Sequence, residues 1–336
     1  MQLEVLISEE IIKLKKLTLN TLASIGLMST PALVHAGYDT HPRFDEFANE
    51  LLEEHNIPVE QTRQWLSEAE KQQSVLDAIA RPAEKVLEWK DYQDIFLTEK
   101  RISGGKEFLR KHSGTLERIE QETGVPKEII TSILGVETYY GRRQGSYRVL
   151  DSLSTLAFDY PKRPLFWREL KSFFVMVQQE EMDAGKVKGS YAGAMGYGQF
   201  IPSSYLAYAV DGDGDSKKDL WENPTDAIAS VANYFKRHGW KTGEAVTQPV
   251  TVTGENYKSV VNGNRKPSQT AGDILKLGVK PSSPVSNDSP ATLMQFEGKK
   301  GTEFWLGEYN FYVITRYNHS RMYALAVYQL SEALKD

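Results

Sequence analysis

The sequence predicts an α+β protein that is mainly helical and carries a small antiparallel β insertion near its C-terminus. From about Arg43 to Lys241, apolar residues recur at the three- and four-residue spacing of helices. After Thr247 apolar and polar residues alternate, as they do in strands. The last residues return to the helical spacing. Runs of helices followed by a run of strands are typical of the α+β class.

Residues 1–36 have the pattern of a cleavable signal peptide. Three lysines precede a modest apolar run from Leu17 to Met28, and small residues lead up to Ala36. Polar residues and Pro31 interrupt the run, so a signal peptide is favoured over a helix that spans the membrane. We therefore expect this leader to direct export and to be removed, although an uncleaved leader would instead anchor the chain.

The composition is that of an ordinary globular protein, and it excludes several kinds of site. Hydrophobic residues make up 40% and charged residues 25% of the chain, and the net charge of −5 argues against nucleic-acid binding. The chain has no cysteine, which excludes disulfides, thiol catalysis, cysteine-based zinc sites and a lipid-modified cysteine. Its six histidines are scattered and lack metal-ligand spacing.

We expect the mature chain to begin with a helical region, residues 37–110, followed by a larger helical core, residues 111–245. Apolar residues at helical spacing predict helices over 44–52, 108–119 and 226–235. Gly239 is placed to end the last of these helices. No internal repeat is visible along the sequence.

Residues 246–314 are expected to form a small β domain. Val250–Thr253 alternates between apolar and polar residues, and further strands are predicted at 292–296, 303–306 and 311–315. The remaining residues, 315–336, include a helix with apolar residues such as Met322 and Leu325 at helical spacing. We expect this last helix to pack back on the helical core.

Glu137 is the residue that most suggests catalysis. It lies on a predicted helix that starts at Val125-Pro126, and it continues the apolar stripe four residues after Ile133. None of its helical neighbours is a cation, so its carboxylate would lose water without gaining a partner. Such burial raises the pKa of a carboxyl group, and a glutamic acid protonated near neutral pH can act as a general acid on a glycosidic bond. The alternative is a helix-end glutamate that faces solvent or pairs with an arginine.

A second cluster of small and polar residues lies between positions 189 and 205. Gly193 and Gly196 would let the backbone approach a ligand or another helix closely. Ser190 offers a hydroxyl, and Gln199 offers both a donor and an acceptor, which suits the N-acetyl and hydroxyl groups of an amino sugar. Tight helix packing around a turn is the structural alternative.

An acidic loop over residues 211–222 has the spacing of an EF-hand calcium site. Oxygen ligands stand at loop positions 1, 3, 5, 7, 9 and 12, between two helical segments. Position 6 is Ser216, where glycine usually makes the sharp turn, so we expect a reduced calcium affinity. A solvated acidic turn without metal is the alternative. The candidate ligands are Asp211, Asp213, Asp215, the carbonyl of Lys217, Asp219 and Glu222.

Four stretches of the chain carry a specific resemblance when taken together. They are Gly135–Thr138, Asp151–Arg163, Ala192–Tyr205 and Thr315–Ser320. In this order they resemble the membrane-bound lytic murein transglycosylase B family, and the resemblance runs from about Arg43 to the C-terminus. It implies a lysozyme-like catalytic core within a larger α+β body. It also implies cleavage of the β-1,4 bond between N-acetylmuramic acid and N-acetylglucosamine in peptidoglycan, which leaves a 1,6-anhydromuramoyl end.

The resemblance also implies a location and partners. Together with the predicted leader it indicates a periplasmic protein, and the absence of cysteine indicates that it is not a lipoprotein. The expected partner is the glycan strand of peptidoglycan, bound by a monomer. Other cell-wall enzymes are a further candidate partner, whereas nucleic acid is not expected.

The resemblance assigns roles to individual residues. Glu137 matches the sole catalytic acid and base, and Ser190 and Gln199 match polar residues near the reacting sugar. Further cleft residues are matched by Tyr317, Asn318, Tyr323, Tyr234 and, more weakly, Tyr92.

Two positions depart from the family pattern. Lys162-Arg163 stands where the family often has two arginines. The lysine keeps the positive charge for lactyl or peptide-stem carboxylates, but it cannot form the paired hydrogen bonds that arginine makes with a carboxylate. In the family's calcium loop the last acidic ligand aligns better with Asp226 than with Glu222. One extra residue before Pro224 leaves the choice between these two carboxylates open.

One carboxyl group is sufficient for the implied reaction. Glycosidases generally use two carboxylates about 5–9.5 Å apart, and Asp151 and Asp159 are the candidates that folding could bring close to Glu137. In a transglycosylase, Glu137 would protonate the leaving oxygen and then accept the proton of the muramoyl 6-hydroxyl, which attacks within its own sugar. The alternatives are a muramidase that delivers water to the same bond, and a noncatalytic scaffold that binds peptidoglycan or calcium.

Overall fold

The structure is a computed structural model that describes residues 37–80, 87–160 and 164–335. The predicted signal peptide and the pair Lys162-Arg163 lie outside the described residues. None of the described helices combines the length and the apolar character needed to cross a bilayer.

The described chain forms two compact units, each built from separate stretches of sequence. The first unit contains residues 87–143 and 208–335, and the second contains residues 37–80, 144–160 and 164–207. The predicted α+β class is confirmed, because helices dominate and one small antiparallel sheet is present. The domain boundaries expected at 110, 245 and 314 stay predictions.

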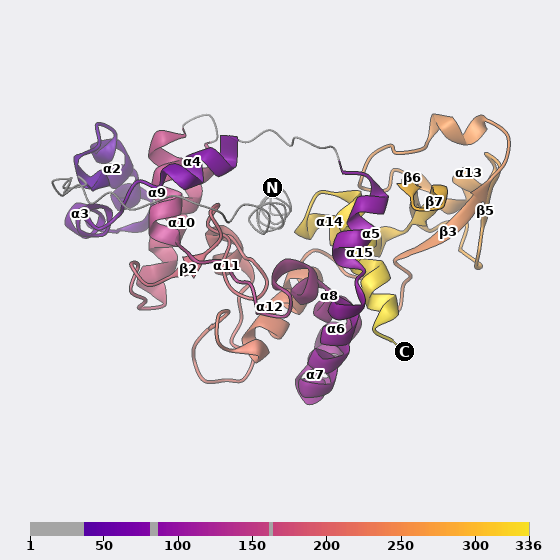
Figure 1. Ribbon diagram of the computed structural model, residues 1–336, viewed down its shortest axis with the longest axis horizontal. Coiled ribbons are helices and arrows are strands. Elements are labelled where there is room, and N and C mark those ends of the chain that lie inside the picture. Colours follow the sequence, from indigo (N-terminus) through magenta and orange to yellow (C-terminus); the bar gives the residue numbers. More distant parts are fainter. Residues whose placement is uncertain (1–36, 81–86, 161–163, 336) are drawn as a thin grey trace, which may run out of the picture. The chain divides into compact units, whose positions relative to one another are not determined.

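The second unit is a group of helices with a short two-stranded ladder (Figure 1). The helix predicted over 44–52 is confirmed as part of α2. The elements of this unit are η1 (Tyr38–Thr40), α2 (Phe44–His55), α3 (Val59–Ser67), α4 (Gln73–Ala80), β1 (Tyr147–Arg148), α9 (Val149–Asp159), α10 (Leu165–Gln179), β2 (Lys188–Gly189) and, at its end, α11 (Pro202–Tyr208).

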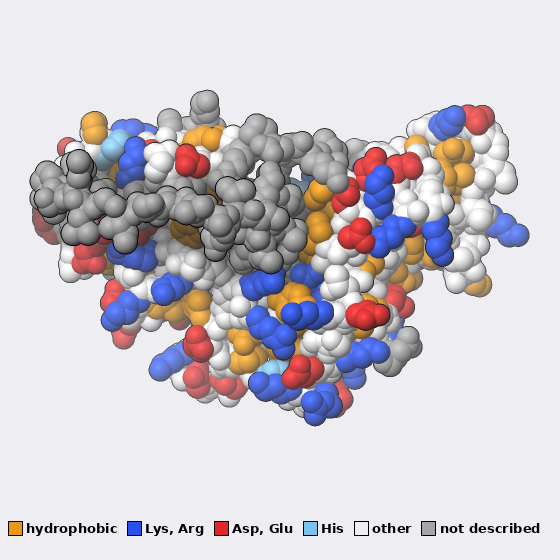
Figure 2. All heavy atoms as spheres, in the orientation of Figure 1, with side chains coloured by type: hydrophobic (Ala, Val, Ile, Leu, Met, Phe, Trp, Pro, Cys, Tyr) orange, Lys and Arg blue, Asp and Glu red, His pale blue; other side chains and the backbone are white. Residues whose placement is uncertain are grey.

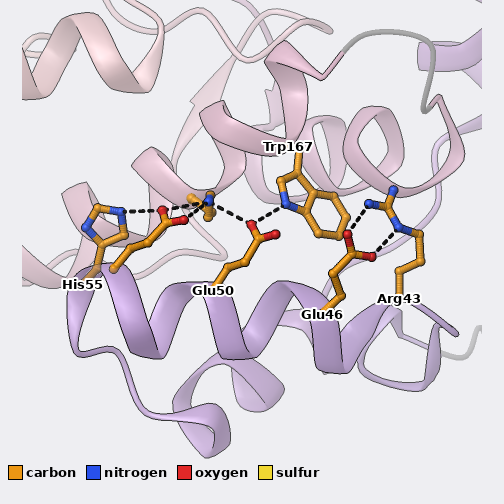
Figure 3. Close-up of polar contacts among 7 residues, drawn as sticks. Arg43, Glu46, Glu50, His55 and Trp167 are labelled. Atoms are coloured by element: carbon orange, nitrogen blue, oxygen red, sulfur yellow. Dashed lines mark hydrogen bonds and ion pairs between the residues drawn. The ribbon is translucent and has the colours of Figure 1, made fainter.

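Polar contacts, drawn in Figure 3, and an edge-to-face ring contact fasten α2 to α10. The buried Lys171 of α10 donates to Glu50 at 2.8 Å and to Glu54 at 2.7 Å, and the indole of Trp167 donates to Glu50 at 2.8 Å. The ring of Phe47 meets the Trp167 ring edge to face at 4.9 Å. The charged residues on this side of α2 therefore have structural roles.

The first unit contains the helix that carries Glu137 and the helices around it. They are α5 (Trp89–Phe96), α6 (Glu99–Lys111), α7 (Ser113–Thr123), α8 (Lys127–Thr138), α12 (Pro224–Arg237), α14 (Tyr309–Tyr317) and α15 (Arg321–Ala333). α8 packs against α6, α7, α12 and α15 (Figure 1). The helices predicted at 226–235 and near the C-terminus are confirmed as α12 and α15.

The single helix predicted over 108–119 is wrong, because the chain breaks there into α6 and α7. His112 leaves the helical conformation between them, with φ −113° and ψ 23°. The two residues that follow are Ser113 and Gly114, which favour helix interiors less than most residues do. The apolar spacing continues across the break, so periodicity alone did not reveal it.

A five-stranded antiparallel sheet in the order β4-β6-β7-β3-β5 completes the first unit. Val250, Leu293 and Leu306 lie in its buried core with Ile274 of the short helix that covers it. The strands predicted at 250–253, 292–296 and 303–306 are confirmed. The elements are β3 (Thr247–Val252), η2 (Asn256–Ser259), β4 (Gln269–Thr270), α13 (Ala271–Leu275), β5 (Val279–Pro281), β6 (Pro290–Gly298) and β7 (Gly301–Gly307).

The strand predicted at 311–315 is wrong, because these residues belong to α14. Their aromatic and β-branched side chains favour a strand locally. Burial at helical spacing decides otherwise, since Asn310, Phe311, Ile314 and Tyr317 are all buried on one helix that packs against α15 and β7. Tertiary packing therefore overrides local propensity in this segment.

On the face shown in Figure 2, basic and acidic side chains are interspersed rather than separated. Among the described residues, Leu52 is the large hydrophobic side chain that stands out as exposed, at 42%. A single exposed leucine is normal for a soluble surface.

Candidate active site

Glu137 is buried near the end of α8, with 1% of its surface exposed. The helix begins directly after Pro126, as the proline predicted, and every residue from Ile129 to Thr138 is buried. Burial raises the pKa of the Glu137 carboxyl to about 8, although a hydrogen bond from Tyr323 acts in the opposite direction. The predicted burial and pKa shift are confirmed, and the alternative of a solvent-facing glutamate is wrong.

The two carboxyl oxygens of Glu137 have different surroundings. The hydroxyl of Tyr323 donates to Oε1 at 2.7 Å. Oε2 is buried and has no hydrogen-bond partner among the described residues, and no described cation pairs with the group. Because Oε1 already accepts a hydrogen bond, the acid form is best satisfied with its proton on Oε2. That oxygen is therefore the one able to give a proton to a bound substrate.

Three predicted cleft tyrosines gather around Glu137 from three helices. The negative charge of Glu137 is among the causes that raise the pKa of both Tyr317 and Tyr323, after burial as the largest cause. The rings of Tyr234 and Tyr317 meet edge to face at 4.8 Å. The Tyr234 hydroxyl donates to the carbonyl oxygen of Arg316 at 2.6 Å. The first unit thus surrounds the acid with aromatic rings that carry polar tips.

Asn318 and Tyr92 lie in the same unit. Asn318 follows the last residue of α14 and is 5% exposed, and its Oδ1 accepts from the backbone N–H of Ser320 at 3.1 Å. Its Nδ2 is buried without a partner among the described residues. Tyr92 is buried on α5, which packs against α15, the helix that carries Tyr323. An unpaired buried amide donor is costly, so Asn318 is a candidate to bind a ligand oxygen.

The backbone after Glu137 is strained. Tyr139 and Tyr140 both have positive φ, at 57° and 61°, a conformation that costs free energy in residues other than glycine. The Tyr140 ring fills the space beside Gly135, where an added Cβ would lie 2.6 Å from ring atoms. Glycine at 135 is therefore required for this close approach.

Arg101 of α6 holds the end of α8, and sequence reasoning missed it. Its Nε donates to the carbonyl oxygen of Gly135 at 3.1 Å, and its guanidinium lies 4.8 Å from the centre of the Tyr139 ring. The Tyr140 hydroxyl donates to the Arg101 carbonyl oxygen at 2.7 Å. Arg101 is thus a positioning residue for the helix end that carries Glu137. No spacing in the sequence connects it to α8.

Ser190 and Gln199 belong to the second unit, and both are buried. Ser190 Oγ accepts from the N–H of Ala194 at 3.0 Å. Gln199 Nε2 donates to the carbonyl oxygens of Gln144 and Gly196, both at 3.1 Å. These bonds build the predicted tight loop, whereas the role of both side chains at the reacting sugar stays a prediction.

The two candidates for a second carboxylate have partners within the second unit. Asp151 accepts from the N–H of Glu70 at 3.0 Å and lies 3.4 Å from Arg148. Asp159 pairs with Lys71 at 3.1 Å. Both carboxylates therefore have structural roles of their own.

The acidic loop brings together part of the predicted ligand set, since Asp211 and Asp213 lie in one group with Asp226, whereas Asp215 and Asp219 are not in that group. Oxygens of Asp211, Asp213 and Asp226 lie within 4.8 Å of one another, a group that could hold a metal ion. Asp226 also accepts from the N–H groups of Gly212 at 2.8 Å and Asp219 at 2.7 Å. Glu222 is not part of this group, which favours Asp226 as the closing ligand.

The backbone of this loop fits the calcium pattern. Ser216 has φ 69°, the left-handed conformation for which glycine is preferred at position 6. The turn therefore forms with serine in place, at a cost in strain. The gathered carboxylate oxygens of Asp211, Asp213 and Asp226 suit a hard cation such as calcium. The predicted ligand Asp215 accepts from the N–H of Lys217 at 2.8 Å.

Comparison with known proteins connects this site to one family. A family model described as a transglycosylase SLT domain matches residues 39–332. The chain is 39% identical over 307 residues to the membrane-bound lytic murein transglycosylase B of Escherichia coli strain K12, covering 88% of this chain and 84% of that protein.

Solved structures give the same result. The soluble lytic transglycosylase SltB1 from Pseudomonas aeruginosa is 48% identical, with a TM-score of 0.84 over 87% of this chain and 98% of that one. The Escherichia coli lytic transglycosylase SLT35, solved in complex with calcium, is 38% identical, with a TM-score of 0.79 over 91% of this chain and 98% of that one.

Proposed function

The chain belongs to the transglycosylase SLT domain family, and we propose that it is a lytic transglycosylase that cleaves peptidoglycan. The bond cleaved is the β-1,4 linkage between N-acetylmuramic acid and N-acetylglucosamine, and the product carries a 1,6-anhydromuramoyl end. The observation that carries this proposal is the buried carboxyl of Glu137, whose pKa of about 8 keeps it protonated at neutral pH.

Glu137 can serve first as the acid and then as the base. With a pKa of about 8, the protonated form exceeds the carboxylate roughly tenfold at pH 7. The acid gives its proton to the leaving glycosidic oxygen. The resulting carboxylate is stabilised by the hydrogen bond from Tyr323 and accepts the proton of the muramoyl 6-hydroxyl.

The attacking hydroxyl belongs to the same sugar as the anomeric carbon, so its effective molarity is high and no water needs to be activated. Cleft contacts for the glycan are proposed for Ser190, Gln199, Tyr234, Tyr317, Asn318, Tyr323 and Tyr92. Lys162 and Arg163 are proposed to meet carboxylates of the substrate.

Product analysis on purified sacculi tests the proposal. Mass spectrometry should find anhydromuramoyl ends with the wild type and near-complete loss of products with Glu137→Gln. The matched control is Glu128→Gln, a glutamate in the first turn of the same helix, which should retain activity. Reducing ends would identify a muramidase instead, and a wild type that releases no product would favour a noncatalytic scaffold.

For the acidic loop we propose a structural calcium ion held by Asp211, Asp213, Asp226 and the carbonyl of Lys217. It would neutralise the gathered carboxylates and fix the loop to the first turn of α12, the helix that carries Tyr234. The support is the donor set and the calcium complex of the SLT35 relative.

We further propose that the protein works in the periplasm as a monomer after removal of residues 1–36. The support is the pattern of the leader and the location of the substrate outside the cytoplasmic membrane.

A further inference from the structure

A pocket of about 850 Å³ lies in the first unit. It is bounded by the start of α5, the turn at 262–266, β6 and the junction between α14 and α15. Among the described residues that line this pocket, none is a predicted site residue. The pocket is nevertheless close to the predicted site residues in sequence, because Arg316 and His319 line it on either side of the pair Tyr317-Asn318.

Four cationic side chains line this pocket and find no acidic partner. They are Arg265, Lys266, Arg316 and Arg321. Arg265 donates to the carbonyl oxygen of His319 at 3.2 Å, and Arg321 donates to the carbonyl oxygens of Asn262 and Gly263. Within residues 87–160 and 164–335, none of the four makes an ion pair. Their positive charges are therefore free to bind an anion.

Two glutamates also line the pocket, and both have other partners. Glu88 pairs with Lys90 at 2.5 Å, and the carboxylate of Glu297 accepts from Gln295 at 3.2 Å and from Thr302 at 3.0 Å. With four cationic side chains and two glutamates, the lining of the pocket has a net positive charge.

Two further features favour a negative ligand at this place. The N-terminal turn of α15 faces the pocket through Ser320 and Arg321, and a helix N-terminus carries partial positive charge. Burial, followed by the charge of Arg265, lowers the pKa of both Arg321 and His319. Such crowding of cations is relieved when an anion binds between them.

The pocket also offers apolar surface. Trp89 and Phe296 line it as nearly buried rings, 1% and 6% exposed, and the half-buried Tyr312 adds a more accessible ring. A small inorganic ion would leave the accessible apolar surface of the pocket without contacts. The ligand that fits has carboxylates joined by short apolar segments, since guanidinium groups pair with carboxylates through two parallel hydrogen bonds.

We propose that this pocket binds carboxylates of the peptide stem that the peptidoglycan strand carries, and that it makes the enzyme prefer glycan with stems. The inference rests on the proposed function, which supplies the substrate. It assigns the pocket cations as specificity residues that act on the stem, whereas Glu137 acts on the sugar bond.

The test compares two substrates: intact sacculi, and the same glycan after an amidase has removed the stems. The variant is Lys266→Gln with Arg316→Gln, because neither side chain bonds to another described residue and the fold should not depend on them. We expect about a tenfold loss of kcat/KM on intact sacculi and no loss on stripped glycan. The matched control is Lys276→Gln, an exposed cation of the same unit that pairs with Asp273 at 3.1 Å.

Equal losses on both substrates, or no loss on either, would overturn the pocket assignment. A wild type that cleaves neither substrate would overturn the proposed function, and a binding measurement then tests the pocket alone. The probe is the free stem peptide released by the amidase, measured by calorimetry beside its C-terminal amide. Tighter binding of the free acid to the wild type than to the double variant supports the pocket; equal binding rejects it.

Discussion

The hydroxyl of Tyr323 donates a hydrogen bond of 2.7 Å to Oε1 of Glu137, although 186 positions separate the two residues in the chain. Both side chains are buried, with 0% and 1% of their surface exposed. The bond joins α15 to α8 and opposes the effect of burial on the carboxyl, because a donated hydrogen bond favours the charged form. The strength of Glu137 as an acid therefore depends on a helix at the far end of the sequence.

Replacing Tyr323 with phenylalanine should make Glu137 a weaker acid. Without the hydroxyl, burial acts unopposed and the pKa of Glu137 rises further. The loss of a hydrogen bond to a charged group, worth about 1.5–3 kcal/mol, should also slow proton donation roughly 10- to 100-fold, because that step forms the carboxylate which Tyr323 stabilises. The base limb of the pH profile of kcat/KM should move to higher pH. An unchanged limb would contradict this role, and Tyr328→Phe on the same helix is the control.

The wild-type enzyme should lose activity as the pH rises through about 8. The acid form of Glu137 starts the reaction, and its pKa lies at about 8. Above that value kcat/KM should fall about tenfold for each pH unit, because the protonated fraction falls in that proportion. Initial rates of anhydromuropeptide release measure the profile. A midpoint near 4.5, the ordinary value for a glutamate, would show that the carboxyl is solvated during catalysis.

Glu137 should also make the folded state less stable at high pH. Its folded pKa of about 8 lies above the ordinary 4.5, so the folded protein binds the extra proton between these two values. The favourable contribution is complete below pH 4.5 and is lost as the pH rises through 8. Glu137→Gln should flatten the pH dependence of the free energy of unfolding over this window. Urea melts across the window measure it, and the same slope in both proteins would refute the assignment.

Much of this site could be predicted from the sequence because its causes are local. The apolar stripe before Glu137 is a property of one helix, and it predicted burial and the raised pKa. The calcium loop follows from a fixed spacing within about a dozen residues. Even there, the choice between Asp226 and Glu222 required the fold, since the backbone N–H groups of Gly212 and Asp219 both turn toward Asp226.

The features that the sequence did not reveal depend on distant partners. Arg101 acts through the carbonyl oxygen of Gly135, and a backbone oxygen leaves no trace in a side-chain pattern. The segment 311–315 has the composition of a strand, yet its packing against α15 and β7 makes it helical. The cationic pocket joins a turn near Arg265 to the helix junction near Arg321, and no periodicity relates the two.

Gly135 should not tolerate even the smallest side chain. An alanine Cβ would lie 2.6 Å from the Tyr140 ring, which is itself held by the hydrogen bond to the Arg101 carbonyl. Overpacking of this kind costs about 1–3 kcal/mol, and it would displace the helix end beside Glu137. Gly135→Ala should therefore lower both the free energy of unfolding and activity. The control is Gly114→Ala in α7, where nothing lies within 4 Å and a gain of up to about 1 kcal/mol is expected.

Calcium should stabilise the folded protein, and two variants can identify the ligands. Asp211, Asp213 and Asp226 repel one another without a cation, so a bound ion stabilises the native state alone. At a free calcium concentration about 100-fold above Kd, the gain is about 2.7 kcal/mol, which calorimetry detects as a rise in Tm relative to a chelated sample. Asp213→Asn should abolish the rise, because it removes an exposed member of the group. Glu222→Gln should retain it, since that carboxylate lies outside the group; the reverse pattern would make Glu222 the closing ligand.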